Sequence, residues 1–215
     1  MAFEKILILE SSWAESDDRY VADSRSTSKI YSGIESLLSI HDKPVFSINR
    51  PLLKDYYISH IEQFIKLPSN KKGINVIVLS AHGSHELIEK GDRSVHRRIL
   101  KAIDGDINIS KDIRKLSKKL NKSIFILDAC NVGVNSESFR EASCALGVIG
   151  FSEATDWIDS SVFILALLLK FQAKGIYNRS NISRDLPDRI LKTMESGSYR
   201  SLFEKLGVNY SFGAA

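Results

Sequence analysis

The chain has 215 residues, of which 43% are hydrophobic and 26% are charged, a balance that excludes a disordered chain. A folded chain of this length hides roughly 70% of the surface that its unfolded form exposes, so a single domain needs no disulfide scaffold. With 30 Lys and Arg residues and 26 Asp and Glu residues, the formal net charge is +4. This charge is too small to require nucleic acid or an anionic membrane as partner.

The first residues and the cysteines point to the cytoplasm. Residues 1–9 lead directly into an apolar strand and lack the basic start and cleavage site of a signal peptide. Cys130 and Cys144 are too few for a secreted scaffold, and both lie in or beside apolar runs typical of buried structure. The most apolar segment, residues 162–169, is shorter than the roughly 20 residues that cross a bilayer. We therefore expect a cytoplasmic protein with reduced thiols and a core helix over 162–169.

Short apolar runs alternate with helical patterns along most of the chain. Continuous apolar runs suit strands that are buried on both faces, as in a parallel sheet. The predicted strands lie at residues 6–9, 45–48, 74–79, 124–127 and 147–151. Apolar residues three and four apart predict helices between them, near 30–38, 58–64 and 113–120. This alternation predicts an α/β fold, with a mostly parallel central sheet that has helices on both faces.

The remaining segments frame this sheet. The polar stretch 11–28 predicts a loop at the carboxyl end of the first strand, where it would border a site, because open α/β sheets bind ligands beyond the carboxyl ends of their strands. Helical patterns return at 186–194 and 202–206. We interpret residues 176–215 as a helical cover and not as a second domain.

Two predicted strands end in reactive side chains. The strand at 74–79 runs into Ser80, Ala81, His82 and Gly83, and the strand at 124–127 runs into Asp128, Ala129 and Cys130. If these strands are neighbours, His82 and Cys130 face each other at the sheet edge. A cysteine nucleophile and its proton-transfer partner need this arrangement.

These motifs resemble those of the caspase-like cysteine peptidases, a clan that includes caspases, metacaspases and the bacterial CHAT proteases. His82 precedes Cys130 by 48 residues, close to the roughly 50 residues of the caspase pattern. Asp128 and Gly133 depart from animal caspases, which have Gln before Ala-Cys and Gly two residues after Cys, and are similar to metacaspases and CHAT proteases. The resemblance continues through residues 107–113, 145–151 and 156–159.

This resemblance covers roughly residues 3–175 and implies a three-layer α/β/α sandwich, a single peptidase domain over residues 1–215. It implies a catalytic dyad in which His82 deprotonates Cys130 and then protonates the leaving amine. The backbone N–H groups of Gly83 and Cys130 would form the oxyanion hole, with each donor worth about 3 kcal/mol. Gly133 has a structural role in the turn that follows the nucleophile.

Asp128 is the main candidate for substrate binding. Side chains two apart on a strand share a face, so its carboxylate lies beside Cys130 and would oppose a thiolate unless a substrate cation neutralised it. We therefore expect cleavage after Arg or Lys, as the resemblance to metacaspases also implies. Glu153 and Asp156 are weaker candidates for the same pocket. The two tryptophans, Trp13 and Trp157, are candidate apolar walls.

Other polar residues receive plainer interpretations. His85 lacks partners at metal-ligand spacing and is expected to be a solvated loop histidine, so we expect no metal. Arg97 and Arg98 are expected on solvated helix surfaces, and Cys144 is expected to be ordinary packing. No Gly-rich phosphate loop follows a strand, so we expect no nucleotide and no other cofactor.

Three hypotheses for function follow. The leading one is a cysteine endopeptidase that cleaves a protein substrate. The resemblance implies that this substrate is a pore-forming or toxic effector in bacterial defence or cell death. It also implies an activator protein as a further partner. The alternative is a catalytically inactive binding or scaffold module. A flavodoxin-like nucleotide or signalling domain is the third. Few residues separate Cys130 from the fifth strand, so we also expect activity without internal cleavage.

Overall fold

A six-stranded sheet forms the centre of the computed structural model, which describes residues 4–11, 30, 31, 33, 36, 37, 45–67, 74–91, 93–174 and 185–213. The strand order is β2-β1-β3-β7-β8-β9, in which the first five strands are parallel and β9 is antiparallel to β8. The strands are β1 (Glu4–Glu10), β2 (Val45–Pro51), β3 (Asn75–Ser80), β7 (Ser123–Asp128), β8 (Gly147–Phe151) and β9 (Val208–Phe212). All five predicted strands are therefore confirmed.

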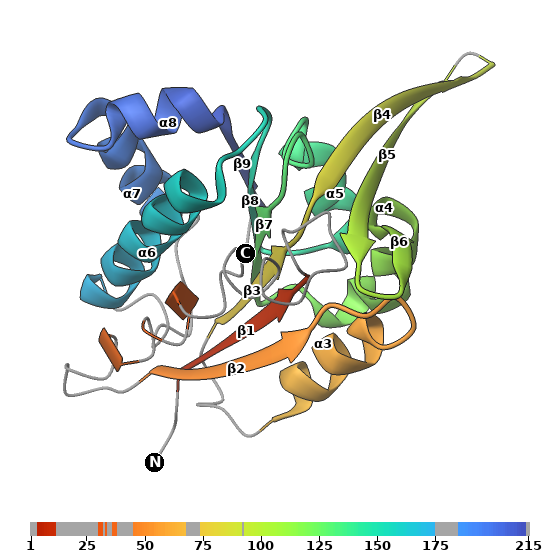
Figure 1. The fold of residues 1–215 in the computed structure, drawn as a ribbon, viewed down its shortest axis with the longest axis horizontal. Coiled ribbons are helices and arrows are strands. Elements are labelled where there is room, and N and C mark those ends of the chain that lie inside the picture. Colours follow the sequence, from red (N-terminus) through yellow and green to blue (C-terminus); the bar gives the residue numbers. More distant parts are fainter. Residues whose placement is uncertain are drawn as a thin grey trace, which may run out of the picture.

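Helices cover both faces of this sheet, as Figure 1 shows. One face packs against α6 (Trp157–Ala173), α7 (Asp185–Ser196) and α8 (Arg200–Leu206). The other face packs against α3 (Tyr57–Lys66), the 3-10 helix η1 (Ile113–Lys119) and α5 (Ser136–Ser143). The predicted α/β sandwich is confirmed.

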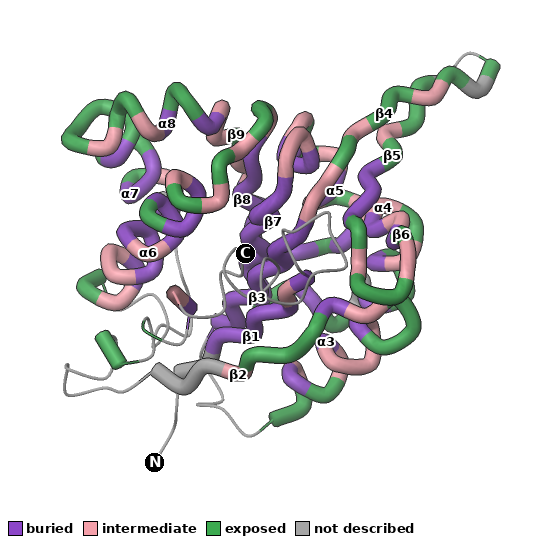
Figure 2. The backbone as a smooth tube through the Cα atoms, in the orientation of Figure 1, coloured by how far each residue is buried: buried purple, intermediate pink, exposed green. Residues whose placement is uncertain are grey.

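The sheet lies buried between these layers. Every residue of β3, β7 and β8 is buried, and Figure 2 shows the same strands as the interior of the molecule. Side chains alternate between two apolar clusters, so that Ile124 and Ile126 face α6 while Phe125 and Leu127 face α5. Burial on both faces is why these segments are continuously apolar in sequence.

The predicted core helix over 162–169 is confirmed as part of α6. Asp156 caps its N-terminus, because the Asp156 side chain accepts a hydrogen bond from the Ile158 amide at 2.8 Å. Phe163 then packs edge-on against Phe151 of the sheet and Phe203 of α8, with ring centroids 5.8 and 6.0 Å apart. The helix thus joins one sheet face to the C-terminal helices.

A second, three-stranded antiparallel sheet was not predicted. It consists of β4 (Gly83–Lys90), β5 (Arg93–Ala102) and β6 (Gly105–Asn108), and its β4–β5 hairpin projects from the body of the molecule in Figure 1. A short helix, α4 (Ile109–Asp112), follows it. The hairpin strands are largely polar and exposed, so they lack the apolar run by which the central strands are recognised.

Other differences are smaller. Residues 113–119 form the 3-10 helix η1 instead of an α-helix, and the C-terminal stretch contains β9 in addition to helices. The described residues between 30 and 37 are helical, as predicted. Trp13 and nearly all of the predicted loop 11–28 lie outside the described residues. Among the described helices, none combines the length and apolar character that crossing a bilayer requires.

Candidate active site

The two motif-bearing strands are neighbours. β3 and β7 pair in parallel, with Ser80 opposite Asp128, and the Ala81 amide donates to the Asp128 carbonyl at 3.1 Å. His82 comes two residues after Ser80, and Cys130 comes two residues after Asp128. Both side chains are half-buried. The carbonyl of His82 accepts from the Lys101 amide of β5 at 2.9 Å. The histidine and cysteine motifs therefore lie side by side at the carboxyl edge of the sheet.

Gly83 lies against the cysteine segment too closely for any side chain. A Cβ atom on Gly83 would come within 2.5 Å of Val132 Cγ2, 2.8 Å of Ala129 Cβ and 3.0 Å of the Cys130 carbonyl oxygen. Only glycine lets the backbone after His82 approach the backbone around Cys130 in this way.

The turn after Cys130 is held against β8. Asn131 and Asn135 adopt left-handed conformations, with φ of 58° and 49°, which asparagine tolerates better than most residues. The Gly133 amide donates to the Phe151 carbonyl at 2.8 Å, and a Cβ on Gly133 would lie 2.2 Å from the Phe151 amide nitrogen. Gly133 is thus structural, and what requires glycine there is a close backbone approach.

Arg98 of β5 holds this turn from the other side. Its guanidinium donates to the carbonyls of Val132 at 3.1 Å and of Val134 and Asn135 at 2.7 Å each. It also donates to two hydroxyls, those of Ser138 at 2.8 Å and Ser110 at 3.2 Å. One cation therefore binds three successive parts of the segment that leads from the nucleophile into α5.

The burial of Arg98 corrects its expected place on a solvated helix surface. The side chain is 1% exposed, lies in a strand, and has its guanidinium 5.8 Å from the centroid of the Phe139 ring. Burial lowers the pKa of Arg98 to about 10. Nothing in the sequence around Arg98 distinguishes it from Arg97, which is exposed and pairs with Glu86, so its role was not predictable.

The sulfur of Cys130 contacts Thr155, in the loop between β8 and α6. The Thr155 amide lies 3.3 Å from Sγ, its Oγ1 lies 3.4 Å away and its carbonyl oxygen 3.8 Å away. The sequence indicated this loop as a pocket wall but not Thr155, since a lone threonine carries no motif.

Asp128 lies beneath this edge, fully buried. Its Oδ2 accepts hydrogen bonds from the hydroxyls of Tyr31 and Ser80, both at 2.7 Å. Its Oδ1 has no hydrogen-bond partner among the described residues. Burial raises the pKa of the Asp128 carboxyl above its ordinary value, although hydroxyls of Tyr31, Ser80 and Ser160 act in the opposite direction. The predicted carboxylate is thus in place two residues before Cys130, but in a buried network.

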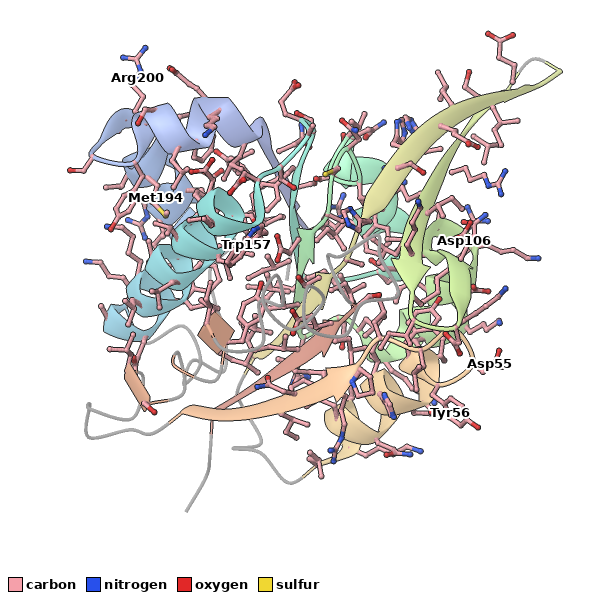
Figure 3. All side chains as sticks on the ribbon, in the orientation of Figure 1. Asp55, Tyr56, Asp106, Trp157, Met194 and Arg200 are labelled. Atoms are coloured by element: carbon pink, nitrogen blue, oxygen red, sulfur yellow. The ribbon has the colours of Figure 1, made fainter. Side chains whose placement is uncertain are left out.

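The other two candidate carboxylates are placed differently. Glu153 is exposed, and its backbone carbonyl accepts from the Asn131 amide at 3.2 Å. Asp156 is exposed as well, and its carboxylate is engaged as the cap of α6. Trp157, labelled in Figure 3, is half-buried as the first residue of that helix. Asp128 is the one buried carboxylate of the three.

His85 and Cys144 differ from expectation. His85 belongs to strand β4 and pairs with His96 of β5, Nε2 to Nδ1, at 2.8 Å. Burial, followed by the positive charge of Arg98, lowers the pKa of both imidazoles. Cys144 is exposed and ends α5 in a left-handed conformation. Within the described ranges, no cluster of three or more His, Cys, Asp or Glu side chains could hold a metal ion.

No protein-family model and no curated protein matches the chain. The solved Drosophila initiator caspase Dronc aligns with 99% of this chain and 81% of its own, at 12% identity and a TM-score of 0.50. A secreted C11 cysteine protease from Bacteroides thetaiotaomicron, solved with an irreversible peptide inhibitor, aligns with 83% of this chain and 58% of its own, at 11% identity and a TM-score of 0.48. A solved protein from Geobacter sulfurreducens aligns with 99% of this chain and with 93% of its own chain, at 13% identity and a TM-score of 0.46. At these identities the likeness concerns the fold, and the chain has a caspase-like α/β fold.

Proposed function

We propose that this protein is a cysteine endopeptidase in which Cys130 is the nucleophile and His82 the general base. The observation that carries the proposal is the pairing of β3 with β7, which sets the two motif ends side by side beyond Ser80 and Asp128. Nucleophile and base on adjacent strand ends are what thiolate attack on a carbonyl requires. The resemblance of the two motifs to those of CHAT proteases and metacaspases supports this proposal.

The reaction proceeds in two halves. His82 takes the thiol proton, the sulfur attacks the carbonyl carbon of the peptide bond, and His82 returns the proton to the leaving amine as the C–N bond breaks. Water, deprotonated by His82, then attacks the thioester, and the C–S bond breaks to release the carboxylic acid and restore the thiol. No cofactor is needed in either half.

The oxyanion of each half would be held by the backbone N–H groups of Gly83 and Cys130. The close packing of Gly83 on Ala129 and Val132 supports this assignment, because it brings the two backbones together at the sheet edge. Donors that are fixed by packing need no reorganisation when charge develops on the carbonyl oxygen.

Asp128 sets the preference for Arg or Lys before the scissile bond. Its carboxylate lies two residues before Cys130 and would supply the negative charge that a cationic substrate side chain pairs with. Glu153, which is exposed beside the same loop, adds negative potential at the rim. Asp156 contributes less, because its carboxylate is already engaged by the helix N-terminus.

The substrate is a protein, and the resemblance to bacterial defence proteases favours a pore-forming or toxic effector that cleavage activates in the cytoplasm, with an activator protein controlling the enzyme. The alternative, a binding or scaffold module with an inactive dyad, is an outcome of the following test.

The test is turnover of fluorogenic peptides varied at P1, with the intact chain, Cys130→Ala and Asp128→Asn. We expect cleavage after Arg and Lys that Cys130→Ala abolishes, and a loss of the basic preference in Asp128→Asn. Cleavage after Asp would contradict the pocket assignment. Turnover that survives Cys130→Ala would contradict the nucleophile, and Cys130→Ala that keeps every partner interaction and phenotype would favour the scaffold.

A further inference from the structure

Thr155 provides all the hydrogen-bond contacts of the Cys130 sulfur within the described part of the chain. Its amide nitrogen lies 3.3 Å from Sγ and its hydroxyl oxygen 3.4 Å from Sγ. Both distances are within the range of hydrogen bonds to sulfur. Thr155 belongs to neither sequence motif, and it lies on a different strand end, after β8.

The two groups of Thr155 respond differently when the thiol ionises. In the neutral form the S–H can donate to Oγ1, or to the Thr155 carbonyl at 3.8 Å. Once the proton has passed to His82, the hydroxyl can rotate and donate to the sulfur, which is then negative. The amide N–H donates in both states. A hydrogen bond to a charged acceptor is the stronger kind, so these two donors favour the thiolate.

The charges around the sulfur make such donors necessary. Asp128 lies two residues before Cys130, and Glu153 and Asp156 flank Thr155 in the loop, so three carboxyl groups lie nearby in the chain. The guanidinium of Arg98 donates its hydrogen bonds to the carbonyls of the turn and to two serine hydroxyls. In the proposed mechanism, His82 carries a positive charge only after it has taken the thiol proton.

We infer that Thr155 is a catalytic residue that positions the Cys130 sulfur and stabilises its thiolate through the backbone N–H and the side-chain hydroxyl. The inference rests on the proposed function, since a thiolate matters only if Cys130 is a nucleophile. It adds a third strand end, that of β8, to the two that carry His82 and Cys130.

The test measures alkylation of Cys130 by iodoacetamide as a function of pH. Cys144→Ser is the background, because Cys144 is exposed and would react as well. Thr155→Val removes the hydroxyl at constant shape, and Thr155→Ser keeps it. We expect Thr155→Val to alkylate about 10-fold more slowly near pH 7, with a midpoint at higher pH, because the loss of one hydrogen bond to a charged group has at least about this effect. Thr155→Ser should stay within about 2-fold of the parent.

Alkylation separates this inference from the proposed function. Identical pH profiles for the parent, Thr155→Val and Thr155→Ser would overturn the role of the hydroxyl even in an active peptidase. A shifted profile in Thr155→Val would support that role even if no peptide is cleaved. Should Thr155→Val fail to fold, as judged by its thermal melt, Thr155→Ala removes the same hydroxyl and decides the matter.

Discussion

The Asp128 carboxylate belongs both to the buried core of the fold and to the proposed substrate pocket. It must stay buried in the fold, where Tyr31 and Ser80 donate to one oxygen, and its other oxygen has no partner among the described residues. An unpaired oxygen on a buried carboxylate costs free energy. A residue kept at such a cost is a candidate for function, because a neutral amide of the same shape would satisfy the fold alone.

Asp128→Asn should therefore separate stability from specificity. The amide oxygen still accepts from Tyr31 and Ser80, while the buried charge disappears, so we expect the free energy of unfolding at pH 7 to be unchanged or higher. The basic preference at P1 should be lost. Urea unfolding and peptide turnover measure the two effects, and Glu153→Gln, which alters an exposed carboxylate, is the control with little effect on either.

The sign of the pH dependence is a second readout of the same variant. Burial raises the pKa of Asp128, so the folded state holds this proton up to a higher pH than the unfolded state does. The contribution of the Asp128 proton to the free energy of unfolding is fully present below the ordinary aspartate pKa. It falls as the pH rises through the raised pKa of the folded state. Asp128→Asn should flatten that part of the profile. An identical pH profile in the variant would contradict the assignment.

At the scale of elements, the turn after the nucleophile depends on a strand of the hairpin. Arg98 of β5 crosses to this turn and satisfies the carbonyls of Val132, Val134 and Asn135. Arg98 is a buried cation whose printed hydrogen bonds all go to backbone carbonyls and hydroxyls, so its role is to hold the turn. The position of Cys130 is therefore coupled to the hairpin whose first strand begins directly after His82.

Arg98→Met should be strongly destabilising, because it leaves three backbone carbonyls without their donor. We expect a loss of about 3 to 5 kcal/mol in the free energy of unfolding. Arg97→Met is the matched control: its guanidinium pairs with Glu86 at 3.3 Å on the surface, and its loss should cost less than about 1 kcal/mol. If urea unfolding gave equal losses of the free energy of unfolding for the two variants, the contacts of Arg98 with the turn would not stabilise the fold.

The same elements show what the sequence could and could not reveal. Strands β3 and β7 are buried on both faces, so their apolar runs and the residues that end them were predictable. β4 and the first half of β5 are polar and mostly exposed, and the buried apolar part of β5 is short, so no pattern marked them as strands. The contacts of Arg98 and Thr155 join segments far apart in the chain, and neither residue carries a local signal of its partners.

At the scale of the whole molecule, the segment between Cys130 and β8 is part of the core. Ser136 and Phe139 of α5 are fully buried, and the Ser136 amide donates to the Asn209 side chain at 3.0 Å, which links α5 to β9 at the sheet edge. A linker cut during maturation has to be exposed and weakly held. This segment has exposed side chains such as Glu137 and Glu141, but it is not weakly held, because it is fixed by β9 on one side and by Arg98 on the other.

The intact chain should therefore be the active form. Cleavage between Gly133 and Glu141 would cut either the turn that Arg98 holds or α5 itself, and so would remove the support of that turn. We expect full labelling of Cys130 by a peptide inhibitor in a chain whose mass shows no cut, and a loss of labelling when a protease site inserted after Asn135 is cleaved. The same insertion left uncut is the control. A chain that stays unlabelled until it is nicked in this segment would refute the prediction, since it would make α5 an obstacle to the site instead of its support.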